Sequence, residues 1–282
     1  MKKPCLVLEG GGNRGIFTSG VLDCLMEKGI EFPYVVGVSA GACNAVDYVS
    51  GQIGRTKDCI IGKDFPRPLI RYRYLAEKKM LVDMDLLFDD VPNRINPFDY
   101  ETYFHSPMKC ELVTADCLTG RAAYLDDRKD RSRLMKIVRA SSSMPFVSPM
   151  VDVDGIPYLD GGIADPIPIG RALRLGYRKP VIVLTRQKGY RKKPSAVSIK
   201  LAKTVYRRYP QVQICLRRRH QIYNKTMELV ERLEREGRIF VFRPSQVLVG
   251  RTEENPGKLS AFYRQGYEMA QNRMEELEKF LK

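Results

Sequence analysis

Short apolar runs alternate along the chain with glycine-rich turns and with stretches whose apolar residues have helical spacing. Residues 5–9 form such a run, typical of a strand buried on both faces of a parallel sheet. A helical pattern follows over residues 16–28 and ends at Gly29. A second apolar run over 34–38 leads into a helical pattern over 40–50. Two strand–turn–helix units in succession predict a parallel sheet flanked by helices.

The remainder of the chain continues this α/β pattern. Further strands are expected over residues 108–115, 121–125, 151–158, 180–185 and 238–242. Further helices are expected over residues 67–78, 131–140, 165–175, 197–208, 211–236 and 257–281. Residues 51–106 are harder to assign, and we interpret them as a cap or insertion near the functional site, supplying contacts to an acyl chain.

Length and cysteine content narrow the class of protein. The 282 residues suit one large α/β domain or two small ones. A signal peptide is not expected at the N-terminus, and no run approaches the ~18–20 apolar residues of a membrane span. The seven cysteines form no C-x-x-C pair, which favours reduced thiols in a cytoplasm. Only two histidines are present, which argues against a zinc site.

Charge is distributed unevenly. The net charge is +15, and residues 166–227 contain 17 Lys or Arg but no Asp or Glu. Such a field favours an anionic partner, which could be a phospholipid surface, an acidic substrate or nucleic acid. The same residues could simply form a solvated basic face, and charge alone does not decide between these interpretations.

A single serine has the sequence context of a catalytic nucleophile. Gly37, Ser39 and Gly41 form a G-x-S-x-G pattern at the junction of the strand at 34–38 and the helix at 40–50. This pattern is that of a nucleophile elbow, a strained turn that presents the serine at the tip of a strand. Glycine is needed on either side because a side chain would collide with the neighbouring strand or helix.

A glycine run follows the first strand. Gly10, Gly12 and Gly15 also satisfy the dinucleotide-binding pattern, but that fingerprint requires an acidic residue where the next strand ends, and Ser39 stands there instead. Because loops after adjacent parallel strands meet at one edge of the sheet, we expect the glycine run beside Ser39. Its bare N–H groups could stabilise negative charge on a substrate oxygen.

A carboxylate is expected at a later strand end. The hairpin over 151–158 delivers Asp160, which is followed by Gly161 and Gly162 and is therefore suited to close approach by another group. The serines at 141–143 are alternative nucleophiles without a glycine frame. We expect them instead to line a pocket or to cap backbone groups.

Taken in order, the motifs at residues 10–15, 37–41 and 160–162 resemble those of the patatin-like phospholipases, in particular bacterial ones. The resemblance covers residues 4–185 and includes residues 140–145. It implies a three-layer α/β/α sandwich with a mostly parallel central sheet. Residues 186–282 would form a basic, mostly helical C-terminal region that packs on or extends this catalytic domain.

The resemblance also implies a chemistry. Ser39 would be the nucleophile and Asp160 the base of a Ser–Asp dyad, which cleaves carboxylic esters of phospholipids or related lipids through an acyl-enzyme. The implied oxyanion hole comprises Gly10, Gly11, Gly12 and Arg14. The remaining motif glycines are Gly15, Gly37, Gly41, Gly161 and Gly162. Neither a metal nor a cofactor is implied. The expected partners are a lipid substrate and an anionic membrane surface, which a cytoplasmic protein would contact transiently.

Two other interpretations remain open from the residues. Ser39, Asp160 and His220 occur in the chain order of an α/β-hydrolase triad, although three neighbouring arginines would disfavour a protonated His220. His105 is a further candidate base. Alternatively, the chain could be an inactive protein that binds membranes, or nucleic acid through basic and aromatic residues. The residues of that interpretation are Arg217, Arg218, Arg219, Tyr206, Tyr209 and Tyr223.

Overall fold

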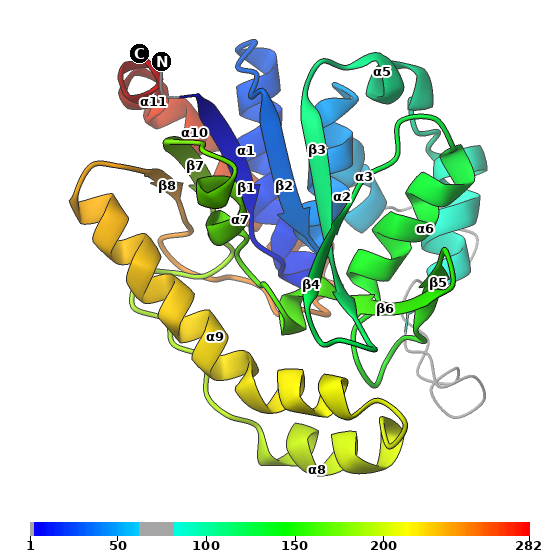
Figure 1. Ribbon diagram of the computed structural model, residues 1–282. Helices are drawn as coiled ribbons and strands as arrows, with labels where there is room; N and C mark the ends of the chain where they lie inside the picture. Colours follow the sequence, from blue (N-terminus) through cyan, green and yellow to red (C-terminus); the bar gives the residue numbers. More distant parts are fainter. Residues whose placement is uncertain (1–2, 62–81) are drawn as a thin grey trace.

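The apolar runs of the sequence form the centre of one sheet. The structure is a computed structural model that describes residues 3–61 and 82–282 (Figure 1). Its parallel strands are β1 (Pro4–Leu8), β2 (Tyr34–Val38), β3 (Lys109–Asp116), β7 (Lys179–Val183) and β8 (Phe240–Phe242). Antiparallel strands are β4 (Ala122–Leu125), β5 (Val151–Val153) and β6 (Ile156–Asp160). The expected helix over 67–78 lies outside the described residues.

Strand order determines which loops meet. The order is β5-β6-β3-β2-β1-β7-β8, with β4 paired to β3. In the middle of the sheet, Leu6 of β1 pairs with Val35 of β2 on one side and Val181 of β7 on the other. The carboxyl ends of β1 and β2 are therefore adjacent, as expected from the sequence, and β6 joins beside β3 at the same edge.

Helices cover both faces of the sheet. The first part of the chain contains α1 (Gly15–Glu27), α2 (Ala40–Val49), α3 (Arg55–Ile61), η2 (Leu86–Ile95), α5 (Tyr100–His105), α6 (Arg131–Ser142) and α7 (Ile169–Arg174). The second part contains α8 (Ala196–Val205), α9 (Pro210–Arg235), α10 (Pro256–Asn272) and α11 (Met274–Leu281). Two short 3-10 turns are η1 (Gly12–Arg14) and η3 (Gly161–Ile163).

Alternation along the central strand divides the core in two. Leu6 and Leu8 of β1 belong to the cluster shared with α1, α2, α6 and α10. Cys5 and Val7 point to the opposite face and pack with residues of α7 and α9. Because successive side chains of a strand point to opposite faces, an apolar run of this kind needs helices on both sides. The three-layer fold with a mostly parallel sheet is thereby confirmed.

Several predicted helix limits were wrong. The helix expected to end at Ala140 continues through Ser142, so two of the three serines are helical rather than in a loop. The helix expected over 165–175 is reduced to α7, because Pro166 and Pro168 disfavour helical backbone in the residues before them. The helix expected over 257–281 divides at Arg273, whose guanidinium donates to the Val241 carbonyl at 2.7 Å.

Residues 186–282 are joined to the rest by backbone pairing and close packing. β8 extends the sheet beside β7. Helix α10 lies against α1, and side chains at Gly20 or Gly266 would overlap the backbone of the facing helix. A domain boundary between residues 185 and 186 stays a prediction. Over the described residues, no helix is both long and apolar enough to cross a bilayer.

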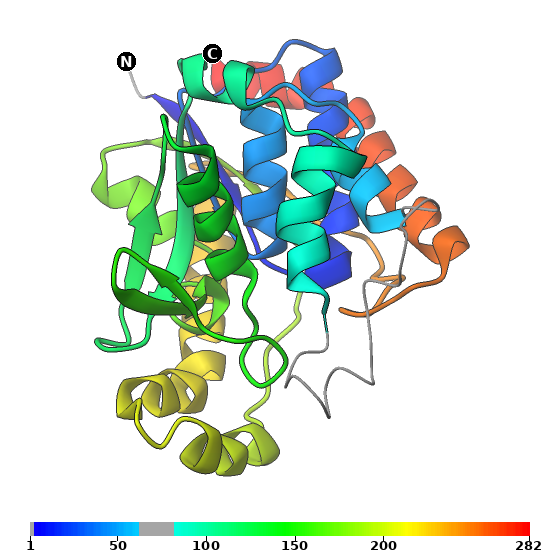
Figure 2. The same cartoon turned by 90° about the vertical axis from the view of Figure 1, so that its right-hand side faces the viewer.

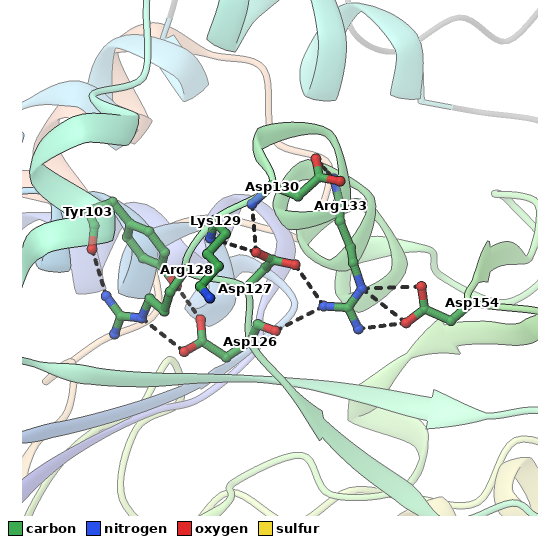
Figure 3. Close-up of polar contacts among 8 residues, drawn as sticks. All are labelled: Tyr103, Asp126, Asp127, Arg128, Lys129, Asp130, Arg133 and Asp154. Atoms are coloured by element: carbon green, nitrogen blue, oxygen red, sulfur yellow. Dashed lines mark hydrogen bonds and ion pairs between the residues drawn. The ribbon is translucent and has the colours of Figure 1, made fainter.

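A polar network fixes the start of α6. Asp127 accepts hydrogen bonds from the amides of Lys129 and Asp130 at 2.8 Å each and from Arg133 at 2.9 Å (Figure 3). Arg133 also donates to Asp154, in the turn between β5 and β6, at 2.6 Å. Since α6 ends at the candidate site and β6 carries Asp160, this network fixes two supports of the site relative to each other.

Candidate active site

Ser39 occupies a strained turn between β2 and α2. Its φ of 58° and ψ of −126° lie where side chains are disfavoured, at a cost of about 1–3 kcal/mol. Neighbouring glycines permit the turn: a side chain at Gly37 would overlap the carbonyl of Gly41, and one at Gly41 would approach the Leu8 carbonyl to 2.6 Å. The backbone geometry thus agrees with the nucleophile elbow predicted from the sequence.

The end of α6 supports this turn. The Ser39 amide donates to Ser141 Oγ at 2.9 Å, and Ser141 Oγ donates to the Val113 carbonyl at 2.7 Å. Ser141 is fully buried, so its hydroxyl supplies the partner that both backbone groups would otherwise lack. The sequence suggested backbone capping by one of the three serines but could not indicate which one.

The glycine run lies directly beside the serine. A Cβ placed on Gly10 would lie 3.0 Å from the Cβ of Ser39, and one on Gly15 would lie 2.7 Å from that of Ala40. The amides of Gly10 and Gly11 donate to no acceptor that the structure describes. Free amides at this position are suited to stabilising an oxyanion.

Residues of the C-terminal region hold the glycine run in place. The amide of Asn13 donates to the Arg251 carbonyl at 2.9 Å, and the Asn13 side chain donates to the Glu253 carbonyl at 2.8 Å. Gly12 has a φ of 59°, and a side chain there would collide with Arg251. The sequence motif gives no sign of this dependence on residues 251–253.

Asp160 ends β6 and is buried, with 4% of its surface exposed. Its Oδ1 accepts a hydrogen bond from the Gly162 amide at 2.7 Å. A side chain on Gly161 would overlap the Val113 carbonyl, which explains the glycine after the acid. Arg219 of α9 donates to the Gly162 carbonyl at 3.1 Å, so the C-terminal region also fixes this loop.

Ser39 lies between two cavities of different character. One has a volume of about 590 Å³ and is lined mainly by apolar side chains, including Val46, Phe88 and Val138. The other has a volume of about 30 Å³ and contains both Ser39 and Asp160 in its wall. The two side chains thus face a common space, although no direct hydrogen bond joins them among the described residues.

Comparison with known proteins places the chain in a family. The family model described as patatin-like phospholipase matches residues 6–173, and a second model, described as a domain of unknown function, matches residues 209–282. The chain belongs to the patatin-like phospholipase family. This membership places it in a family of lipid acyl hydrolases.

Several curated relatives are similar to part of this chain. An uncharacterized protein of Escherichia coli, YjjU, is 31% identical over 193 residues, which cover 64% of this chain and 51% of the relative. An uncharacterized NTE family protein of Mycobacterium bovis is 28% identical, covering 58% of this chain and 44% of its own length. The chain therefore spans about half the length of these two relatives.

A solved structure shows the same patatin-like fold. VipD from Legionella pneumophila aligns over 98% of this chain and 67% of its own, with a TM-score of 0.52 and 15% identity. At that identity the similarity concerns the arrangement of helices and strands. It includes residues beyond 185, so the C-terminal helices are part of the aligned fold.

Both histidines lie outside the cavities at Ser39. His105 ends α5, near the amino end of β3, and its side chain is 75% exposed. Figure 1 shows α5 at the end of the sheet opposite to the carboxyl end of β2. His220 borders neither cavity that Ser39 lines, and no hydrogen bond joins its side chain to a described residue. The structure thus lends no geometric support to a triad through either histidine.

Two helices of the segment 51–106 line the apolar cavity at Ser39. Residues of α3 and η2, both within the expected insertion over 51–106, form part of its wall. At its polar end, Arg55 forms an ion pair of 2.8 Å with the buried Asp47. Burial raises the pKa of Asp47, and the charge of Arg55 opposes this rise.

Proposed function

We propose that the chain is a serine lipid acyl hydrolase, a phospholipase A or esterase that uses Ser39 as nucleophile and Asp160 as base. The observation that supports this most strongly is the position of Ser39. It sits in a strained elbow between an apolar cavity of acyl-chain size and a polar cavity that contains Asp160.

The proposed reaction proceeds in two steps. Asp160 accepts the hydroxyl proton as Ser39 Oγ attacks the ester carbonyl. It then gives this proton to the leaving alkoxide, which departs as the alcohol and leaves an acyl-enzyme. Water activated by Asp160 then releases the fatty acid. The free amides of Gly10 and Gly11 would stabilise the oxyanion in both steps, each contributing about 3–4 kcal/mol. We include Gly12 and Arg14 in the same oxyanion site.

An exposed apolar stripe on α8 supports contact with a membrane. Val197, Leu201 and Val205 are 77%, 43% and 52% exposed, and their spacing of four residues places them on one face. Exposed basic side chains surround them, namely Lys200, Lys203, Arg207 and Arg208. Figures 1 and 2 show α8 beyond the carboxyl end of β2, the end that presents Ser39. We propose that this face meets anionic lipid from the cytoplasmic side.

Of the three tyrosines named in the nucleic-acid interpretation, two are buried, and the third, Tyr209, is half-buried. Tyr206 and Tyr223 are 5% and 2% exposed, so neither ring is available to stack on a base. The basic residues of the C-terminal region are better explained by lipid and substrate chemistry.

Hydrolysis of a nitrophenyl butyrate ester and of phosphatidylcholine tests the proposal. Ser39→Ala and Asp160→Asn should each lower kcat by at least about a thousandfold without changing the melting temperature by more than a few degrees. A fluorophosphonate probe should label the native protein and not Ser39→Ala. His220→Ala and His105→Ala serve as controls and should retain activity. Activity that survives in Ser39→Ala, or is abolished by His220→Ala in a folded protein, would refute the dyad.

A further inference from the structure

The small cavity at Ser39 and Asp160 has a basic wall. Its volume of about 30 Å³ accommodates one small group, not an acyl chain. Five cationic side chains line it, namely Arg14, Arg186, Lys192, Arg219 and Arg251. Four of these five come from residues beyond 185, and Arg219 and Arg251 lie within the segment matched as a domain of unknown function.

These cations are not held in salt bridges, although Glu9 attracts Arg14 and Lys192, and Asp160 attracts Arg219. None of the five forms an ion pair with another described residue. The two carboxylates that border the cavity have other partners: Glu9 accepts from the Thr185 amide at 2.6 Å and the Tyr223 hydroxyl at 2.9 Å, and Asp160 accepts from the Gly162 amide. Five basic side chains therefore face two carboxylates, so the cavity wall is predominantly basic.

Aromatic rings, not acids, hold two of these side chains. The Arg186 guanidinium lies 4.3 Å from the centre of the Tyr190 ring, and Lys192 Nζ lies 4.5 Å from that of Tyr223. Ring faces orient a cation without neutralising it, so its charge remains available to a ligand.

Concentrating positive charge in this way is unfavourable without a ligand. Arg14 is only 4% exposed, and its Nε has no hydrogen-bond partner. Burial, then the charges of Arg186 and Arg251, lowers the pKa of Arg14 to about 10. Burial, then the charges of Arg219 and Arg251, lowers the pKa of Lys192 to about 7. A buried, unpartnered guanidinium among like charges is suited to binding an anion.

We propose that this cavity binds a phosphate group, and that residues 186–282 serve to complete it beside the reacting serine. A lipid whose scissile ester lies close to its phosphate would place the acyl chain in the apolar cavity and the phosphate among the five cations. The preferred substrates are therefore phosphorylated lipid esters with a small, anionic head group rather than neutral glycerides. This substrate assignment rests on Ser39 being the nucleophile, whereas the anion site itself does not.

Inorganic phosphate is the first probe. In thermal melts of the full chain, phosphate should raise the midpoint, and Lys192→Met or Arg186→Met should weaken its apparent affinity by about tenfold or more, because each removes one charged contact. Lys192→Arg retains the charge and should restore binding. Lys188→Met and Lys193→Met remove exposed lysines that are close in sequence to Arg186 and Lys192 but do not line the pocket, and both variants should behave like the native protein. Phosphate stabilisation that is equal in all variants would overturn the proposal.

Matched substrates identify the source of the phosphate. The ratio of kcat/KM for a monoacylglycerol 3-phosphate over the monoacylglycerol of the same chain length should exceed about ten, and Lys192→Met should reduce that ratio mainly through KM. Phosphate binding that depends on Lys192 without this preference would support the site for free phosphate and refute the lipid head group. Phosphate binding in a protein without any esterase activity would uphold the anion site and refute the proposed hydrolase.

Discussion

At the scale of single residues, the site depends on the hydrogen bonds and close packing that hold the turn at Ser39. The strain at Ser39 is sustained because its amide and carbonyl are both hydrogen-bonded and its flanking glycines are closely packed. The Ser39 carbonyl accepts from the amides of Ala42 and Cys43 at 2.8 and 3.2 Å, and its amide donates to Ser141 Oγ. Ser141 therefore acts as a positioning residue for the turn, without contact to substrate.

Replacing Ser141 tests this role. Ser141→Ala leaves the Ser39 amide and the Val113 carbonyl buried without their partner, so the free energy of unfolding should fall by about 1–3 kcal/mol. Urea titration followed by circular dichroism measures the change. The neighbouring Ser142→Ala removes a half-buried hydroxyl whose contact is Cys43 Sγ at 3.7 Å, and it should cost less than about 0.5 kcal/mol. Equal losses in both variants would show that Ser141 has no special role.

At the scale of elements, α6 links the two halves of the candidate dyad. Its last turn supports Ser39 through Ser141, and the Ser143 carbonyl just beyond it accepts a hydrogen bond from the Asp160 amide at 2.8 Å. The start of the helix is held by Asp127. Burial alone would raise the pKa of Asp127. Hydrogen bonds from the amides of Asp130 and Lys129 and from the Arg133 guanidinium outweigh burial and hold this pKa below its usual value.

Asp127→Ala should therefore destabilise the protein in a manner that depends on pH. The depressed pKa means that the contribution of Asp127 is fully present above its unfolded value of about 3.9 and is lost as the pH falls through the folded pKa. The free energy of unfolding of the variant should be about 1–2 kcal/mol lower than that of the native protein at pH 7. This difference in free energy should become smaller at pH values below about 4. Urea titrations at neutral and acid pH provide the comparison.

The matched control for this helix start is Lys129→Ala. It keeps the backbone amide that donates to Asp127 and removes an exposed side chain, so it should change stability by less than about 0.5 kcal/mol. A pH-independent loss in Asp127→Ala would mean that packing, not the charged hydrogen bonds, is responsible.

At the scale of the whole molecule, the sequence predicted features that depend on local patterns but not those that depend on long-range contacts. The strands and the elbow at Ser39 were predictable because alternation, glycine spacing and turn chemistry act within a few residues. The division at Arg273 depends on a contact with Val241 in another element, and the basic cavity gathers residues between 14 and 251 with no spacing to connect them. Ser141 differed from its serine neighbours only through tertiary contacts.

The excess of positive charge also acts at the scale of the whole molecule, through the face that α8 presents. Each basic residue near an anionic surface contributes about 1 kcal/mol, and this contribution weakens with added salt. Native protein should therefore cosediment with vesicles of phosphatidylcholine and phosphatidylserine, and much less with vesicles of pure phosphatidylcholine. High salt should weaken its binding to the vesicles that contain phosphatidylserine.

Replacing both Val197 and Leu201 with aspartate should reduce binding by at least about tenfold, because it removes apolar area and adds negative charge to the same face. Leu175→Asp is the matched control, since Leu175 is 45% exposed but precedes the amino end of β7, away from Ser39. A double variant that still binds as the native protein does would show that α8 does not face the membrane, and the basic surface would then have to be explained by the phosphate site alone.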